Sequence, residues 1–282
     1  MNNAAEQLQP VFDEVLPEAE AVKGVVHRLV SAGEPDLPYI LYLPAGQPQP
    51  ERVIVAVHGI SRNVEEHLAA MRSWADEYAT ALVLPLYDKL DFHDYQRLGR
   101  EGHGPRADMP LLRALDEVKQ QFGIDTQRVA LFGFSGGAQF AHRFALMYPK
   151  RVERLGLAAA GWYSWPDEQL PYPFGMGKVR GLAAAQTDLR GLLQIPMCVF
   201  VGKRDTERSR SLNTSLRIDA QQGGNRRERA SNWVRAMREA GLARGIKPQI
   251  QLELLPRTKH AYRRAVTRGQ MIARLYRCFY GE

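Results

Sequence analysis

Short apolar runs alternate along this chain with longer segments in which apolar residues recur every three to four positions. Runs that are apolar on both faces are typical of parallel strands, because helices cover both faces of a parallel sheet. Such alternation predicts an α/β domain with a mostly parallel sheet, and the turn-rich AGEPDLP between the first two runs predicts a leading hairpin. The strand-like runs are 25–31, 39–44, 53–57, 81–86, 128–134, 154–160, 197–201 and 249–255.

Helix start and stop signals lie between these runs. Residues 108–123 open on an aspartate with a proline in the first turn and end in glycine, and the apolar residues 136–149 stop at a proline. A further helix is expected over 263–280. Residues 161–187 fit neither period and are rich in aromatic residues and proline, which indicates an ordered loop. This loop is either a lid over a site or a segment held down by its own aromatic side chains.

Length and composition favour a single domain. The 282 residues are 45% hydrophobic and 24% charged, and we assign 25–282 to one soluble domain that follows an N-terminal extension at 1–24. No run of about 18 apolar residues occurs, so no membrane span is expected. The start has no signal-peptide pattern, and Cys198 and Cys278 are expected as two reduced thiols, so we expect a cytoplasmic protein.

The net charge of +7 is unevenly distributed along the chain. Residues 201–282 hold 19 lysines and arginines but 7 aspartates and glutamates, a balance that can attract nucleic acid. In 225–245, however, Ala230, Trp233 and Met237 fall on one face of an amphipathic helix, which leaves the basic residues on a solvent-facing side. No zinc-finger, basic-region or RNA-binding signature accompanies them, so neither nucleic acid nor a membrane is expected as a partner.

The sequence GFSGG places Ser135 between an apolar strand and an apolar helix. In this context it matches the GxSxG nucleophile elbow, where a sharp turn lifts the serine above the sheet edge. Side chains at positions 133 and 137 would collide with the neighbouring strand and helix, which explains the two glycines. An incidental serine in a glycine-rich turn is the weaker interpretation. Ser135 is therefore the candidate nucleophile.

A serine hydroxyl becomes a good nucleophile when a base removes its proton, and the base needs a carboxylate to orient it. His260 follows the last strand-like run, where a loop would place it beside the elbow; His103 is the one serious rival. Asp205 follows the run 197–201, with Glu207 as the fallback. The chain order Ser, Asp, His is the order of this type of site.

Two backbone N–H groups are expected to bind the negative charge that develops on the substrate carbonyl oxygen. One belongs to Gly136, directly after the candidate nucleophile. The other belongs to the turn HGIS after the third strand-like run, where we choose Ile60, with Ser61 as the alternative. His58 of the same turn is expected to brace the loop.

With these motifs, and with ILYLPAG followed by RVIVAVHGIS, the chain resembles the α/β-hydrolase superfamily over nearly all of its length after about residue 25. Within it, the opening resembles the polyhydroxybutyrate depolymerase and feruloyl esterase-like branch, although HGIS stands where that branch tends to have HGxGG. The resemblance implies the α/β-hydrolase fold, the triad Ser135, Asp205 and His260, an oxyanion hole at Ile60 and Gly136, and catalysis without a cofactor or metal.

The expected function is therefore that of a serine hydrolase. It would cleave a carboxylic ester or a related acyl bond of a small-molecule substrate through an acyl-enzyme on Ser135. The alternative is a catalytically silent protein of the same fold that binds a small ligand.

Substrate charge is a separate expectation, because four cations lie near these residues in the sequence. They would favour an anionic substrate if they surround the serine. Pairing with surface acids such as Asp108 and Glu207 is the commoner role for exposed cations. The four cations are Arg106, Arg204, Arg208 and Lys259.

Overall fold

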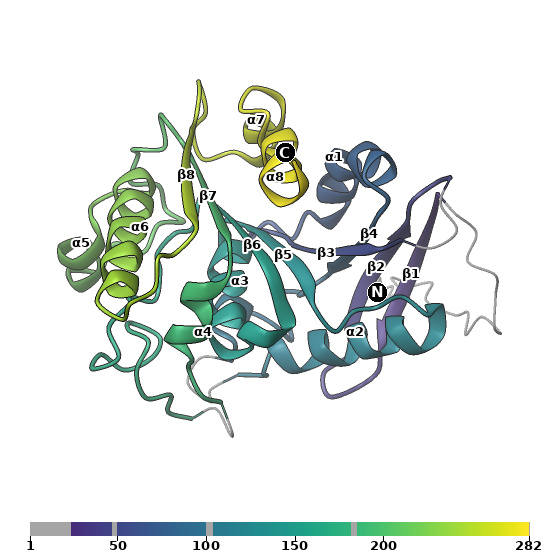
Figure 1. Ribbon diagram of the computed structural model, residues 1–282, viewed down its shortest axis with the longest axis horizontal. Helices are drawn as coiled ribbons and strands as arrows, with labels where there is room; N and C mark the ends of the chain where they lie inside the picture. The colour runs from purple at the N-terminus through teal and green to yellow at the C-terminus, as the bar shows by residue number, and fades with distance from the viewer. Residues whose placement is uncertain (1–23, 47–49, 100–103, 182–184, 282) are drawn as a thin grey trace, which may run out of the picture.

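The computed structural model describes residues 24–46, 50–99, 104–181 and 185–281, so the extension expected at 1–24 lies outside the described residues except for Gly24. Within these residues eight strands form one sheet in the order β1-β2-β4-β3-β5-β6-β7-β8 (Figure 1). The pairs β1–β2 and β2–β4 are antiparallel and the others are parallel. The strands are β1 (Val25–Ser31), β2 (Leu37–Leu43), β3 (Arg52–Val57), β4 (Thr80–Pro85), β5 (Val129–Phe134), β6 (Val152–Ala158), β7 (Met197–Gly202) and β8 (Ile250–Leu255).

Helices cover both faces of this sheet (Figure 1). One face carries α1 (Val64–Glu77), α7 (Tyr262–Thr267) and α8 (Met271–Tyr280). The other carries α2 (Asp108–Phe122), α3 (Gly136–Met147), α4 (Leu189–Gln194) and α6 (Arg226–Leu242), with α5 (Leu216–Gln222) packed on α6. None of the helices in the described ranges has the length and hydropathy that a membrane span requires.

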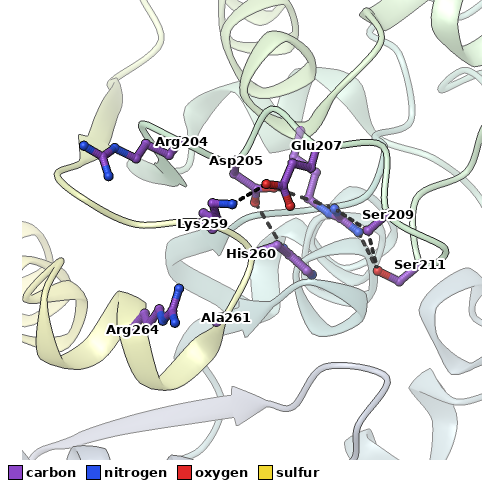
Figure 2. Close-up of a pocket in the computed structure, with 10 residues that line it drawn as sticks. Arg204, Asp205, Glu207, Ser209, Ser211, Lys259, His260, Ala261 and Arg264 are labelled. Atoms are coloured by element: carbon purple, nitrogen blue, oxygen red, sulfur yellow. Dashed lines mark hydrogen bonds and ion pairs between the residues drawn. The ribbon is translucent and has the colours of Figure 1, made fainter.

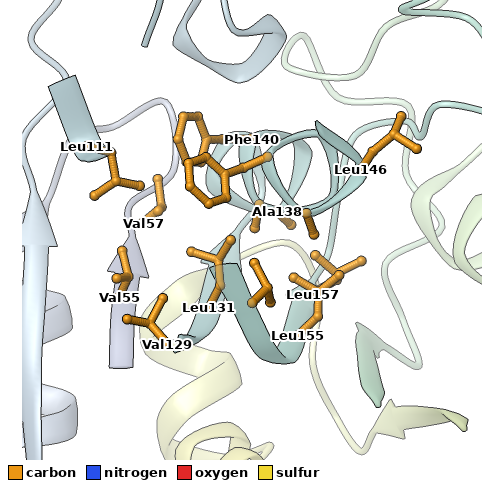
Figure 3. Packing of buried hydrophobic residues seen from close by; sticks show 14 of the residues in the cluster. Val55, Val57, Leu111, Val129, Leu131, Ala138, Phe140, Leu146, Leu155 and Leu157 are labelled. Atoms are coloured by element: carbon orange, nitrogen blue, oxygen red, sulfur yellow. The ribbon is translucent and has the colours of Figure 1, made fainter. Parts of the chain in front are cut away.

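The centre of the sheet is a rigid support for the turn between β5 and α3. Val55, Leu131 and Leu157 of three adjacent strands are fully buried, and they lie beneath Ala138 and Phe140 of α3 (Figure 3). Each large aliphatic side chain buried in this way contributes about 1.5–3 kcal/mol. Ser135, the residue between the strand and the helix, is therefore anchored on both sides by closely packed core.

The expected fold class is confirmed, and each strand-like run lies within two residues of an observed strand end. The helix expected over 263–280 is wrong, because the chain forms α7 and α8 with a break between them. The Gly269 N–H donates to Arg264 and ends α7, and Gln270 has a positive φ of 51°. A methyl group at Gly269 would lie 2.6 Å from the Ala265 carbonyl oxygen, so the closing turn is tight.

The expectation of two reduced thiols is also wrong. Cys198 of β7 and Cys278 of α8 form a disulfide, with their Cα atoms 6.6 Å apart. Both elements were expected from the sequence, but α8 packs across β7 and brings together two cysteines separated by 80 residues.

Helix α6 buries Ala230, Trp233 and Met237, as its amphipathic pattern predicts. Its basic residues do not all face solvent, however, because Arg226 and Arg229 are 1% and 0% exposed. The pattern of apolar positions does not predict the burial of these two arginines, because each one pairs with an acid from a different segment of the chain.

Candidate active site

Ser135 occupies a strained turn between β5 and α3. Its backbone has φ 55° and ψ −110°, and its N–H donates to the Ala158 carbonyl at 2.7 Å. A Cβ at Gly133 would lie 2.2 Å from the Gly137 backbone, and one at Gly137 would lie 2.1 Å from the Val57 oxygen. The steric reason predicted for the two glycines is therefore confirmed, and the turn holds Ser135 at the carboxyl end of the central strand.

The structure brings together the three residues expected from the sequence. His260, in the loop between β8 and α7, places Nε2 3.1 Å from Ser135 Oγ. Its Nδ1 lies 3.1 Å from Oδ2 of Asp205, which follows β7. Ser135 is 6% exposed and Asp205 is 2% exposed, so the hydroxyl is shielded and the carboxylate is almost removed from water. Low exposure strengthens both contacts, because the surroundings screen charge poorly.

The alternatives for these roles are placed elsewhere or lie outside the described residues. Glu207 is exposed and pairs with Lys259, so Asp205 is the carboxylate that contacts His260. His103 lies outside the described residues. Phe134, the residue before the serine, stacks on the His260 ring with centroids 5.4 Å apart and helps to fix its orientation.

A buried arginine lies behind the carboxylate. The Nη1 atom of Arg226 is 3.7 Å from Asp205 Oδ1, and its two terminal nitrogens donate to the hydroxyls of Ser209 and Ser211 at 3.2 and 2.8 Å (Figure 2). Burial lowers the pKa of Arg226, and the nearby Asp205 opposes that shift. Sequence reasoning missed this contact because Arg226 lies 21 residues after Asp205, beyond a loop and the helix α5, and no motif joins them.

The turn after β3 lies against the start of α3. A Cβ at Gly136 would be 3.4 Å from the Ile60 nitrogen, so the two expected oxyanion donors are close together. The Ile60 N–H makes no hydrogen bond to any described residue, and the Gly136 N–H lies in the first turn of a helix, which has no intrahelical acceptor. Tyr95 Oη donates to the His58 carbonyl at 2.8 Å and fixes this turn.

His58 braces the same turn, as expected. Its Nε2 accepts a hydrogen bond from the Tyr87 N–H at 3.0 Å, and its Nδ1 lies 2.8 Å from the Gly59 carbonyl. Burial lowers the pKa of His58 to about 4, so the ring is neutral near pH 7. A neutral ring with both nitrogens engaged supports the loop and is not a second base.

The aromatic segment 161–187 is tied down where the structure describes it; residues 182–184 lie outside that part. Ser164 is fully buried, accepts a hydrogen bond from Arg143 Nε at 3.2 Å, and accepts another at its carbonyl from Trp233 Nε1 at 2.9 Å. These contacts join the segment to α3 and α6. Its role as a lid stays a prediction.

The four cations expected near the serine take different positions. Arg106 pairs with buried Asp108 and contacts Tyr148, at the end of α3 opposite Ser135. Arg208 pairs with Asp219, and Lys259 with Glu207. Arg204 alone of the four lines a cavity beside His260 without such an acidic partner among the described residues.

A protein-family model described as "Esterase PHB depolymerase" matches residues 37–164, the part that holds the HGIS turn and the serine elbow. With the sheet order and the strand–serine–helix turn, this match identifies the fold. The chain has the α/β-hydrolase fold. No curated protein sequence matches it significantly.

Solved structures agree with this α/β-hydrolase fold. Poly(aspartic acid) hydrolase-1 from Sphingomonas sp. KT-1 is 24% identical, with a TM-score of 0.75 over 93% of this chain and 100% of that one. LpqC, a poly(3-hydroxybutyrate) depolymerase from Bordetella parapertussis, is 23% identical, with a TM-score of 0.75 over 94% and 95%. An S-formylglutathione hydrolase from Agrobacterium tumefaciens is 18% identical, with a TM-score of 0.59 over 89% and 93%.

Proposed function

We propose that this α/β-hydrolase cleaves a carboxylic ester or related acyl bond of a small-molecule substrate through an acyl-enzyme on Ser135. The observation that carries the proposal is the continuous path of two 3.1 Å contacts from Ser135 through His260 to Asp205. His260 Nε2 takes the hydroxyl proton as Oγ attacks the carbonyl carbon. Asp205 holds the Nδ1 proton in place and stabilises the imidazolium that forms.

The oxygen that becomes negative in this step would be bound by the N–H groups of Ile60 and Gly136. Donors fixed in advance cost no reorganisation when the charge develops, and one such donor is worth about 10²–10³-fold in kcat. His260 then returns its proton to the leaving group. Water, activated by the same imidazole, releases the acid from Ser135 and restores the free enzyme.

Turnover of p-nitrophenyl esters with different acyl chain lengths tests the proposal. Wild type should hydrolyse at least one of them, and Ser135→Ala should lower kcat by at least about 10³-fold without loss of the folded state. Ser164→Ala, at a buried serine outside the site, is the control for unspecific damage. Turnover that survives Ser135→Ala would contradict the proposal.

The second candidate is a catalytically silent ligand-binding protein of the same fold. The cavity beside His260 favours it, since a cavity can accept a small molecule whether or not chemistry follows. It predicts no turnover of any ester together with saturable binding. The intact set of three contacting residues favours catalysis instead.

The compartment also stays a proposal. The sequence favours the cytoplasm, whereas the Cys198–Cys278 disulfide is more typical of an oxidising compartment. Alkylation of free thiols in intact cells, followed by mass spectrometry of the two peptides, separates these possibilities. Labelled Cys278 indicates a reducing location.

A further inference from the structure

A cavity of about 270 Å³ lies beside His260 on the side of Asp205 (Figure 2). Ser135 does not line it, whereas His260 forms part of its wall. In the proposed reaction His260 gives its proton to the leaving group, so the leaving-group portion of the substrate lies against this ring. The lining residues are Arg204, Asp205, Glu207, Ser209, Ser211, Arg226, Lys259, His260, Ala261 and Arg264.

The charges on this lining do not cancel. Arg226 faces Asp205 and Lys259 pairs with Glu207, which accounts for both acids. Arg204 and Arg264 are exposed, and neither guanidinium makes an ion pair or hydrogen bond with a described residue. Two guanidinium charges therefore remain uncompensated at the cavity.

Other charged groups close to the cavity leave this balance unchanged. Asp219, the next acid along the chain, is already occupied by Arg208 and Arg229. Arg263, beside Arg264 on α7, adds a further exposed cation outside the lining. Figure 2 shows Arg204 and Arg264 on the same side of His260, away from the two serine hydroxyls.

We propose that this cavity is a subsite for a carboxylate carried on the leaving-group portion of the substrate, bound by Arg204 and Arg264. A guanidinium presents paired donors that match both oxygens of a carboxylate. The inference rests on the proposed acyl hydrolysis, because His260 marks the leaving-group side only if it protonates the leaving group. The proposed substrates are therefore those whose alcohol or amine component is an anion.

Three esters of matched reactivity test whether the enzyme recognises a carboxylate in the leaving group or in the acyl group. The carboxylate lies in the leaving group of 3-(butanoyloxy)benzoate, is absent from 3-(butanoyloxy)benzamide, and lies in the acyl group of 3-(succinyloxy)benzamide. Each kcat/KM is divided by the rate of the same ester with hydroxide. The first ester should exceed the second by about tenfold, since two exposed ion pairs contribute about two- to fivefold each. The third should show no such advantage.

Arg204→Gln and Arg264→Gln should each lower kcat/KM for the charged leaving group about two- to fivefold, and the double variant should remove the preference. The neutral ester should change little. Arg263→Gln is the matched control, because it removes a neighbouring exposed charge that does not line the cavity. Added salt should weaken the preference, as expected for exposed cations.

Binding of 3-hydroxybenzoate, measured by calorimetry against 3-hydroxybenzamide, separates this inference from the proposed function. Carboxylate binding that is lost in the double variant, with no ester turnover, supports the subsite and contradicts the hydrolase. Ester turnover with equal kcat/KM for the charged and neutral leaving groups contradicts the subsite and leaves the hydrolase intact. The subsite is also contradicted if Arg263→Gln reduces the preference as much as Arg264→Gln does.

Discussion

Arg226 Nη1 lies 3.7 Å from Asp205 Oδ1, the carboxylate oxygen that does not contact His260. The buried guanidinium therefore lies beside one oxygen of the carboxylate, while the imidazole contacts the other oxygen. Arg226 acts through Asp205 and is a positioning residue.

Arg226→Gln should lower kcat about tenfold, with little change in KM, because Asp205 loses its partner and the uncompensated carboxylate is no longer fixed. Arg226→Lys should restore part of the lost kcat, because it returns a cation beside Asp205. The measurement is kcat and KM, taken separately, with a neutral ester.

Arg227→Gln is the control for that variant, because Arg227 is the next residue of α6 and, within the described part of the chain, its guanidinium hydrogen-bonds to the Lys203 carbonyl alone. A lower melting temperature in Arg226→Gln with unchanged kcat would show that Arg226 is merely structural.

Gly136→Ala should disturb the expected oxyanion hole. The added methyl group would lie 2.6 Å from Tyr95 Oη and 3.0 Å from Ile60 Cγ2, so the turn that carries Ile60 must move away. We expect a fall in kcat of up to about 10²–10³-fold, the effect of losing one donor. Adding Tyr95→Phe removes the closest atom and should recover part of the loss. Equal kcat in wild type and Gly136→Ala is the contrary result.

His67 makes the stability of the fold depend on pH. It is 2% exposed and stacks on Tyr262 with centroids 4.0 Å apart, and burial lowers its pKa to about 3. The unfolded chain, with a histidine pKa near about 6.5, binds a proton that the folded chain does not bind. Stability from this group is therefore present above pH 6.5 and is lost as pH falls from there toward 3.

Urea unfolding at pH 7 and pH 5 measures this effect in wild type and in His67→Phe, which keeps a ring against Tyr262. From pH 7 to pH 5, the free energy of unfolding of the variant should fall by about 2 kcal/mol less than that of wild type. His93→Gln, at an exposed histidine, should behave as wild type. Parallel losses in wild type and His67→Phe would refute the assignment.

The disulfide joins β7 to the last helix and closes a loop with a sequence separation of 80 residues. Cys278→Ser should lower the free energy of unfolding by about 2–4 kcal/mol, because the unfolded chain regains the freedom that the cross-link removes. Ser135 lies on a different element, so activity at low temperature should be retained. Denaturant unfolding of the variant, and of wild type with and without reductant, tests this; identical curves would exclude a stabilising disulfide.

The parts of the structure that the sequence predicted are those with a local cause. Strands β3, β5 and β7 are apolar on both faces because helices cover both, and the glycines around Ser135 follow from a steric conflict within a few residues. The positions of Asp205 and His260 follow from chain order, since parallel strands place their carboxyl ends at one edge of the sheet.

The parts that could not be predicted depend on contacts between distant segments. The pairing of Cys198 with Cys278 requires the packing of α8 across β7. The burial of Arg226 requires the loop that brings Asp205 to the start of α6. The break at Gly269 was hidden because apolar residues keep a helical period on both sides of it.

Reaction with a fluorophosphonate tests the central claim, that Ser135 is an activated nucleophile, most directly. Wild type should gain the mass of one phosphonyl group, mapped to the peptide that contains Ser135. His260→Ala should react at least about 10³-fold more slowly, because the base is removed while the hydroxyl remains. No adduct on folded wild type, or an adduct on a residue other than Ser135, would contradict the account.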